Sequence, residues 1–179
     1  MICPVTTLMS EKKQLTVLSV DPGLQRTGFA VLSSCNSTIK PLTYGCIETK
    51  SKTPLPLRLL SIYNAMDELI SRHNPNELAI EKQYFPLKLS SSNSLFATNQ
   101  ARGVVLLIAA QNNLHVVEYS PNNVKIALTG YGRADKNQVQ NMVQRLLAIR
   151  EIKGPDDISD AIAVGLCHIY TSGSKVFKR

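Results

Sequence analysis

Short apolar runs separated by turn residues dominate the start of the chain, a pattern typical of β-strands. Residues 15–20 are mostly apolar and β-branched, an Asp-Pro-Gly sequence interrupts them, and residues 28–32 resume the apolar run. A third apolar segment covers residues 42–48. This pattern predicts three strands that follow one another as an antiparallel meander.

The middle of the chain alternates between the helical and the strand pattern. Apolar residues recur at helical spacing over residues 57–70, and an Asn-Pro-Asn sequence follows them. Residues 77–81 and 115–119 are short segments that predict two further strands. Between these strands, residues 95–111 predict a helix that contains several small residues.

Helix-start signals mark the last part of the chain. Ser120 and Pro121 predict an N-cap and a first-turn proline of a helix that ends near Gly130. Asp135 opens a capping-box sequence before an amphipathic pattern, and a last helix is expected over residues 156–170. The order of the elements predicts an α/β fold, a mixed five-stranded sheet flanked by helices.

The length of 179 residues suits one domain of ordinary size. We expect a flexible tail over residues 1–13, the folded domain over residues 14–171 and a basic tail over residues 172–179. The longest apolar stretch, residues 103–110, is far shorter than the ~20 residues of a membrane-spanning helix. The N-terminus shows no signal-peptide pattern, so a cytoplasmic protein without membrane attachment is expected.

The charge balance favours a polyanionic partner. The chain has 20 Lys and Arg against 13 Asp and Glu, a net charge of +7. The four cysteines form no C-x-x-C pair, so no zinc knuckle or redox motif is present in the sequence.

Four of the few acidic residues occupy unusual positions. Asp21 ends the first predicted strand and Glu81 the fourth, whereas Asp157 and Asp160 lie three apart on one face of the last helix. Hard divalent cations take oxygen ligands, and two such ions can activate a water and stabilise the leaving oxygen in phosphodiester cleavage. Carboxylates that converge repel one another unless cations lie between them.

Each carboxylate also has a purely structural interpretation. Asp21 could belong to an ordinary Asp-Pro-Gly turn, and Asp157 could be a first-turn aspartate favoured by the helix dipole. Asp160 shares its helix face with apolar residues that should pack on the sheet. Glu81 is the hardest to explain structurally, because it ends a strand of buried character, where a charge is costly unless it faces a cleft or a cation.

Six sequence segments cover roughly residues 15–170. They are V-L-S-V-D-P-G-L-Q-R-T-G-F-A-V, L-A-I-E-K-Q-Y-F, N-Q-A-R-G-V, E-Y-S-P-N-N-V-K, G-x-G-R-A-D-K-N-Q-V-Q-x-M-V and D-D-I-S-D-A-I-A-V-G. In this order and at these intervals they resemble the motifs of RuvC-type Holliday junction resolvases.

The resemblance implies an RNase H-like fold and a homodimer that makes two symmetric nicks in a four-way DNA junction. It assigns metal binding and catalysis to Asp21, Glu81, Asp157 and Asp160, with two Mg²⁺ ions per active site, for which Mn²⁺ can substitute. It also implies a partner complex of the RuvA and RuvB type, which binds junctions and drives branch migration.

Basic and aromatic residues near these motifs are candidates for DNA binding. Lys125 and Lys136 match lysine positions of the family, and Lys136 opens a helix whose free N–H groups favour a phosphate. Arg133 lies in a glycine-containing turn that could present it to the DNA backbone. Of the neighbours Tyr84 and Phe85, we expect one to stack on an unpaired base and the other to pack, with Tyr84 the better fit to the family's aromatic position.

Several alternatives stay open on sequence alone. The small residues Ala97, Ala101 and Gly103 suit either a dimer interface or packing against the domain's own sheet. The strand, Asp-x-Gly, strand opening also begins actin-like ATPases, which need a second lobe. Another RNase H-like nuclease acting on RNA or an RNA/DNA hybrid, and a module that binds DNA without cutting it, are the remaining possibilities.

Overall fold

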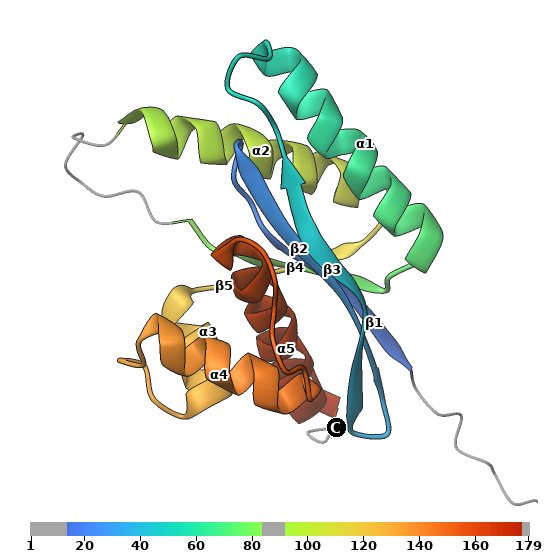
Figure 1. The fold of residues 1–179 in the computed structure, drawn as a ribbon. Helices are drawn as coiled ribbons and strands as arrows, with labels where there is room; N and C mark the ends of the chain where they lie inside the picture. The colour runs from blue at the N-terminus through green and yellow to red at the C-terminus, as the bar shows by residue number, and fades with distance from the viewer. Residues whose placement is uncertain (1–13, 84–91, 177–179) are drawn as a thin grey trace, which may run out of the picture.

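The computed structural model of the chain describes residues 14–83 and 92–176 (Figure 1). Its elements, in chain order, are β1 (Leu15–Asp21), β2 (Arg26–Cys35), β3 (Thr38–Glu48), α1 (Leu55–His73), β4 (Glu77–Glu81), α2 (Ser92–Gln111), β5 (His115–Tyr119), α3 (Pro121–Thr129), α4 (Lys136–Leu147) and α5 (Asp156–Val176).

The strands form one mixed five-stranded sheet in the order β3-β2-β1-β4-β5, as predicted. β1, β2 and β3 are the expected antiparallel meander, and β4 and β5 run parallel to β1. Val20 of β1 aligns with Ile80 of β4, so the residues that follow them, Asp21 and Glu81, reach the same edge of the sheet.

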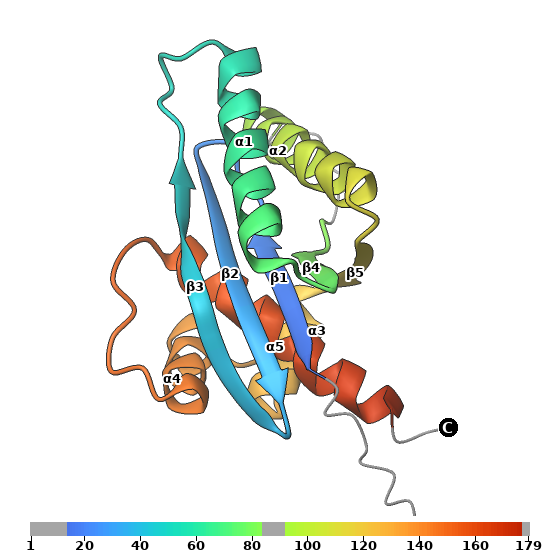
Figure 2. The same cartoon turned by 90° about the vertical axis from the view of Figure 1, so that its right-hand side faces the viewer.

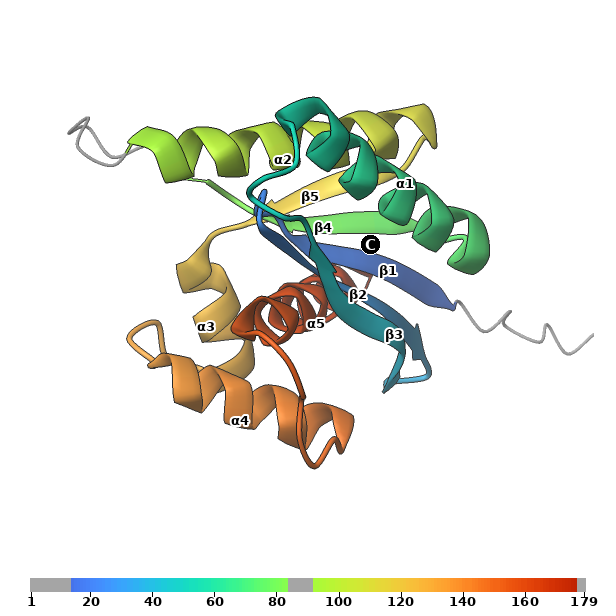
Figure 3. The ribbon, with the colours of Figure 1, turned by 45° about the horizontal axis from the view of Figure 1, so that its top comes forward.

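Helices cover both faces of the sheet. α1 and α2 lie along one face, and α3, α4 and α5 lie on the other (Figures 2 and 3). The alternation along β1 explains the two layers, since Leu18 packs with the α1 and α2 core and Val17 packs with the α5 side.

The predicted helix starts are confirmed. The Ser120 side chain accepts a hydrogen bond from the backbone N–H of Asn123, and Pro121 is the first residue of α3. Asp135 and Gln138 form a capping box at the start of α4. Gly130 ends α3 in the left-handed conformation, with φ of 74°.

Several elements, β2, β3 and α5 among them, are longer than the sequence predicted. β2 and β3 meet in a two-residue turn in which Asn36 and Ser37 have φ of 50° and 65°, a geometry for which the expected Asn-Gly signal is missing. α5 continues to Val176 instead of ending near Tyr170, so part of the predicted tail over residues 172–179 is helical. The predicted tail over residues 1–13 lies outside the described residues.

No helix within residues 14–83 and 92–176 is long and apolar enough to cross a membrane.

Candidate active site

Asp21 and Glu81 stand at the ends of neighbouring parallel strands, where the sequence placed them. Both are partly buried, and neither carboxylate forms a hydrogen bond or ion pair with another described side chain. Burial, followed by the negative charges of Glu81, Asp160 and Asp157 in that order, raises the pKa of Asp21 to about 7. Asp21 therefore lies within the field of all three other candidate ligands.

Close packing of α5 on β2 brings in Asp157. Gly28 of β2 aligns with Asp21, and a Cβ atom at Gly28 would lie only 1.9 Å from the backbone carbonyl oxygen of Asp157. Only a residue without a side chain lets the first turn of α5 approach the sheet at this point. The sequence motif contained Gly28, but no periodicity revealed this contact.

Asp160 joins the same cluster from the next turn of α5. Burial and the charge of Asp160 raise the pKa of Glu81, and Lys136 lowers it. Burial also raises the pKa of Asp160, although a hydrogen bond from Lys136 opposes the shift. The predicted convergence of the four carboxylates at one edge of the sheet is therefore present in the fold.

Two basic side chains balance part of this negative charge. The Nζ atom of Lys136 lies 3.1 Å from Oδ2 of Asp160 and 3.2 Å from Oδ2 of Asp156. The Nε atom of Arg26 lies 3.4 Å from Oδ2 of Asp157. No sequence pattern indicates a role for Arg26, because only the tertiary structure places the start of β2 beside α5.

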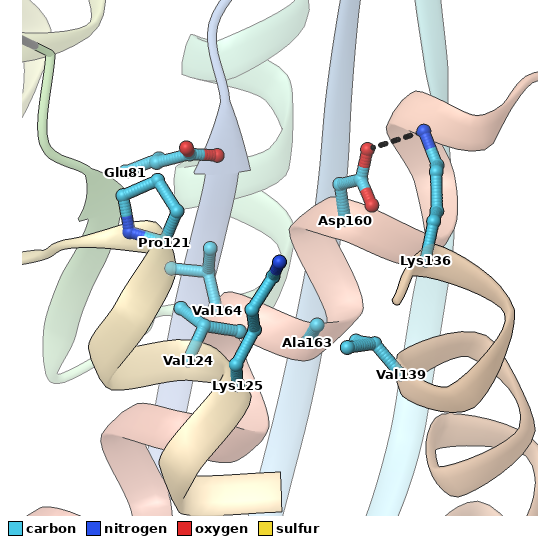
Figure 4. Close-up of a pocket in the computed structure, with 9 residues that line it drawn as sticks. All are labelled: Glu81, Pro121, Val124, Lys125, Lys136, Val139, Asp160, Ala163 and Val164. Atoms are coloured by element: carbon cyan, nitrogen blue, oxygen red, sulfur yellow. Dashed lines mark hydrogen bonds and ion pairs between the residues drawn. The ribbon is translucent and has the colours of Figure 1, made fainter. Parts of the chain in front are cut away.

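Lys125 reaches the site from α3. It lines a pocket of about 280 Å³ together with Glu81, Asp160 and Lys136 (Figure 4). The rest of the pocket is apolar and consists of Pro121, Val124, Val139, Ala163 and Val164. In Figure 4 the Lys125 side chain extends toward the gap between Glu81 and Asp160.

The other candidate DNA contacts lie farther out or beyond the described residues. Arg133 is exposed on the turn between α3 and α4, before Lys136. Tyr84 and Phe85 fall outside the described residues, so their expected roles remain predictions.

The cluster suits a hard divalent ion by its chemistry. In the described parts of the chain, no three His, Cys, Asp or Glu side chains are placed so that they could hold one metal ion. Without a cation between them carboxylates repel, and the Lys136 ammonium lies beside Asp160. The candidate donors are nevertheless all carboxylate oxygens, the ligands that Mg²⁺ prefers, and Asp21 and Glu81 have no competing described partner.

A sheet of this order, with carboxylates from β1, β4 and α5 at one edge, defines the class of RNase H-like nucleases. The family model for "Crossover junction endodeoxyribonuclease RuvC" matches residues 17–168. The chain belongs to this RuvC family, as its motifs predicted.

Relatives and solved structures agree with this assignment. Crossover junction endodeoxyribonuclease RuvC of Caldicellulosiruptor saccharolyticus is 43% identical over 165 residues, which are 92% of this chain and 98% of the relative. The protein of the same name from Finegoldia magna is 43% identical over 161 residues, with 90% and 96% coverage. Thermus thermophilus RuvC, solved in complex with a Holliday junction substrate, matches with a TM-score of 0.82 and 28% identity, covering 88% of this chain and 94% of that one.

Proposed function

We propose that this chain resolves Holliday junctions, as a metal-dependent endodeoxyribonuclease that makes paired nicks in a four-way DNA junction. The observation that carries the proposal is the gathering of Asp21, Glu81, Asp157 and Asp160 at one edge of the sheet in a member of the RuvC family. Its substrate is DNA of the recombining chromosome, so we place its work in the cytoplasm.

The four carboxylates would hold two Mg²⁺ ions, for which Mn²⁺ can substitute. Such ions activate a water for in-line attack and stabilise the leaving oxygen. The four carboxylates together form the proposed metal cage. β1 and β4 present Asp21 and Glu81 from rigid strands, α5 presents the other two, and Arg26 holds Asp157 through its ion pair.

The basic residues around the cage would bind the DNA backbone. Lys125 lines the same pocket as Glu81 and Asp160, where a phosphate could accept a hydrogen bond from its ammonium group. Lys136 is the first residue of α4, and free N–H groups at this helix start favour a phosphate as well. The exposed Arg133 would contact a neighbouring phosphate without reading sequence. Tyr84 keeps its proposed role in stacking on an unpaired base.

The outer face of α2 would form the homodimer interface. Phe96 and Leu107 are 67% and 55% exposed, and Gly103 between them has no atom within 4 Å of a Cβ built there. These three residues share one side of the helix. Ala101 is buried in the domain's own core and Ala97 packs against it, so the small residues serve both of the alternatives that the sequence left open.

Two subunits related by a two-fold axis would each cut one of two equivalent strands. We expect the dimer to work with a complex of the RuvA and RuvB type that binds the junction and drives branch migration.

Incubation with a synthetic four-way junction and Mg²⁺, followed by mapping of the nicks, tests this function. We expect two symmetric nicks in strands of like polarity. Asp157→Asn should bind the junction and remain folded but lose cleavage, because an amide is a poor Mg²⁺ ligand. Faster cleavage of an RNA/DNA hybrid than of the junction would favour a different RNase H-like nuclease. Junction binding without cleavage in Mg²⁺ or Mn²⁺ would indicate a binding module.

A further inference from the structure

Arg102 of α2 is buried, although a guanidinium stays charged at any physiological pH. Its Nη1 atom donates a hydrogen bond of 2.8 Å to the backbone carbonyl oxygen of Glu81. Its Nη2 atom lies 2.6 Å from Oε1 of Glu118 on β5. One side chain thus connects α2 with the ends of β4 and β5.

Burying a guanidinium is costly unless good hydrogen bonds compensate for the lost water. The two groups that Arg102 binds are the compensation. The planar fork of an arginine can bind both at once, whereas the single ammonium of a lysine could not reproduce this geometry.

The backbone carbonyl of Glu81 lies just beyond the last hydrogen-bonded pair between β4 and β1. The pairing of β1 with β4 ends at Val20 and Ile80. Pro22 follows Asp21 and has no N–H with which to extend the ladder. On the other side, the backbone N–H of Lys82 donates to the carbonyl oxygen of Tyr119 on β5. Arg102 therefore supplies a hydrogen bond at the end of β4, just past the last β1 pair.

We propose that Arg102 is a positioning residue, which holds the end of β4 so that the Glu81 carboxylate points into the metal cage. This inference rests on the proposed role of Glu81 as a metal ligand. The guanidinium binds the main chain of Glu81, which leaves both carboxylate oxygens available for a cation. Residues that orient a metal ligand in this way commonly change metal affinity or activity by about 10- to 100-fold when they are replaced.

The test compares metal binding by Arg102→Met, Arg102→Gln and Val105→Ala. Methionine fills similar space without a donor, and glutamine keeps polarity but is too short to bridge both partners. Val105 is fully buried in the same core, one turn farther along α2, so Val105→Ala controls for destabilisation of the helix. Mn²⁺ is titrated in the absence of DNA, and the metal concentration that raises the melting temperature by one fixed amount is measured for each protein.

We expect this metal concentration to rise about tenfold or more in both Arg102 variants and to stay at the parental value in Val105→Ala. The Mg²⁺ concentration for half-maximal junction cleavage should shift in the same way. If one Arg102 variant does not fold, the other carries the test. A folded Arg102 variant that binds Mn²⁺ at the parental concentration overturns the proposal.

Glu81→Gln separates this inference from the proposed function. If Glu81→Gln loses cleavage while the Arg102 variants bind metal like the parent, only the positioning role is wrong. If Glu81→Gln itself binds Mn²⁺ and cleaves junctions like the parent, the proposed metal site is wrong, and the role of Arg102 is wrong with it.

Discussion

Negatively charged carboxylates and two positively charged side chains lie close together at one edge of the sheet. The pKa of Asp21 is strongly raised, because the side chain is partly buried and three further carboxylates lie near it. Lys136 and Arg26 neutralise part of the α5 side, whereas Asp21 and Glu81 have no described cationic partner within ion-pair distance. In the folded protein without metal, burial and then repulsion between carboxylates therefore disfavour negative charge mainly at the strand ends.

Asp21→Asn should stabilise the metal-free protein at neutral pH. The folded state raises the pKa of Asp21 from 3.8 to about 7, so between these values it binds the proton that the unfolded chain releases. Stability is consequently lost as the pH rises from about 4 to 7, and the asparagine variant avoids this loss. Since one pKa unit corresponds to about 1.4 kcal/mol, the gain at pH 8 is at most about 4 kcal/mol.

Urea unfolding in EDTA at pH 4 and pH 8 measures this difference. The two proteins should be closest in stability at pH 4. An Asp21→Asn protein that is less stable than the parent at pH 8 would contradict a raised pKa of Asp21 in the folded state. Mg²⁺ should restore stability to the parent at pH 8 more than to the variant.

Lys125 and Lys136 should differ in their effect on the salt dependence of junction binding. A lysine that neutralises one phosphate contributes about 0.9 to the slope of log K against log salt. Lys125→Ala should lower the slope by about this amount, because Lys125 forms no ion pair with a described residue. Lys136→Ala should lower it less, because its ammonium is already paired with Asp156 and Asp160 in the free protein. Gel-shift titrations at several salt concentrations give both slopes, and equal slopes would contradict this difference.

At the scale of elements, the position of α5 on the sheet decides whether Asp157 and Asp160 lie near Asp21 and Glu81. Two glycine contacts set this position. Gly28 admits the first turn of α5, and Gly165 admits its middle, where a Cβ would lie 2.6 Å from the Ser19 hydroxyl and 2.8 Å from Leu32. Both contacts bring helix and sheet together, but only the first is beside Asp157.

Gly28→Ala should reduce junction cleavage by about 100-fold or more. The added methyl group must push the first turn of α5 away from β2, and a misplacement of about 1 Å at a reacting centre can cost that much. A stability loss of about 1 to 3 kcal/mol is expected as well. Gly165→Ala is the matched control, since it also crowds the contact between α5 and the sheet, but at a point remote from the carboxylates. If both variants cleave equally well at a temperature where both are folded, Gly28 has no special role in placing Asp157.

At the scale of the whole molecule, the two helical layers have different tasks. The α3, α4 and α5 layer carries the lysines and two of the candidate metal ligands. The α1 and α2 layer carries the exposed apolar face proposed for the dimer. Arg102 of α2 also contacts the end of β4, so the proposed dimer helix and the active-site edge belong to one packed unit.

Leu107→Glu should convert the proposed dimer into a monomer. A charge in the middle of an apolar interface would lose its water without gaining a partner. Leu57 of α1 is similarly exposed, at 52% against 55% for Leu107, and Leu57→Glu should leave the dimer intact. Light scattering after gel filtration measures both masses. A dimeric Leu107→Glu protein would exclude this face as the interface.

The sequence by itself determined the elements and the identity of the candidate ligands. Apolar runs separated by turn residues predicted the strands and their meander, and local cap signals at Ser120 and Asp135 predicted where α3 and α4 begin. These features depend on neighbours within a few residues, so a linear pattern can reveal them. The order of the motifs likewise indicated the RuvC family, because spacing along the chain is itself sequence information.

Only the tertiary structure decided which distant residues support the ligands. Arg26 meets Asp157, Gly28 makes room for α5, and Arg102 binds the carbonyl of Glu81, although none of these pairs is close in sequence. The β2–β3 turn also escaped prediction, because Asn36 and Ser37 adopt positive φ angles only where the paired strands require them. Such contacts depend on how the packed layers bring separate segments together, and the local pattern of a segment contains no information about its partner across the core.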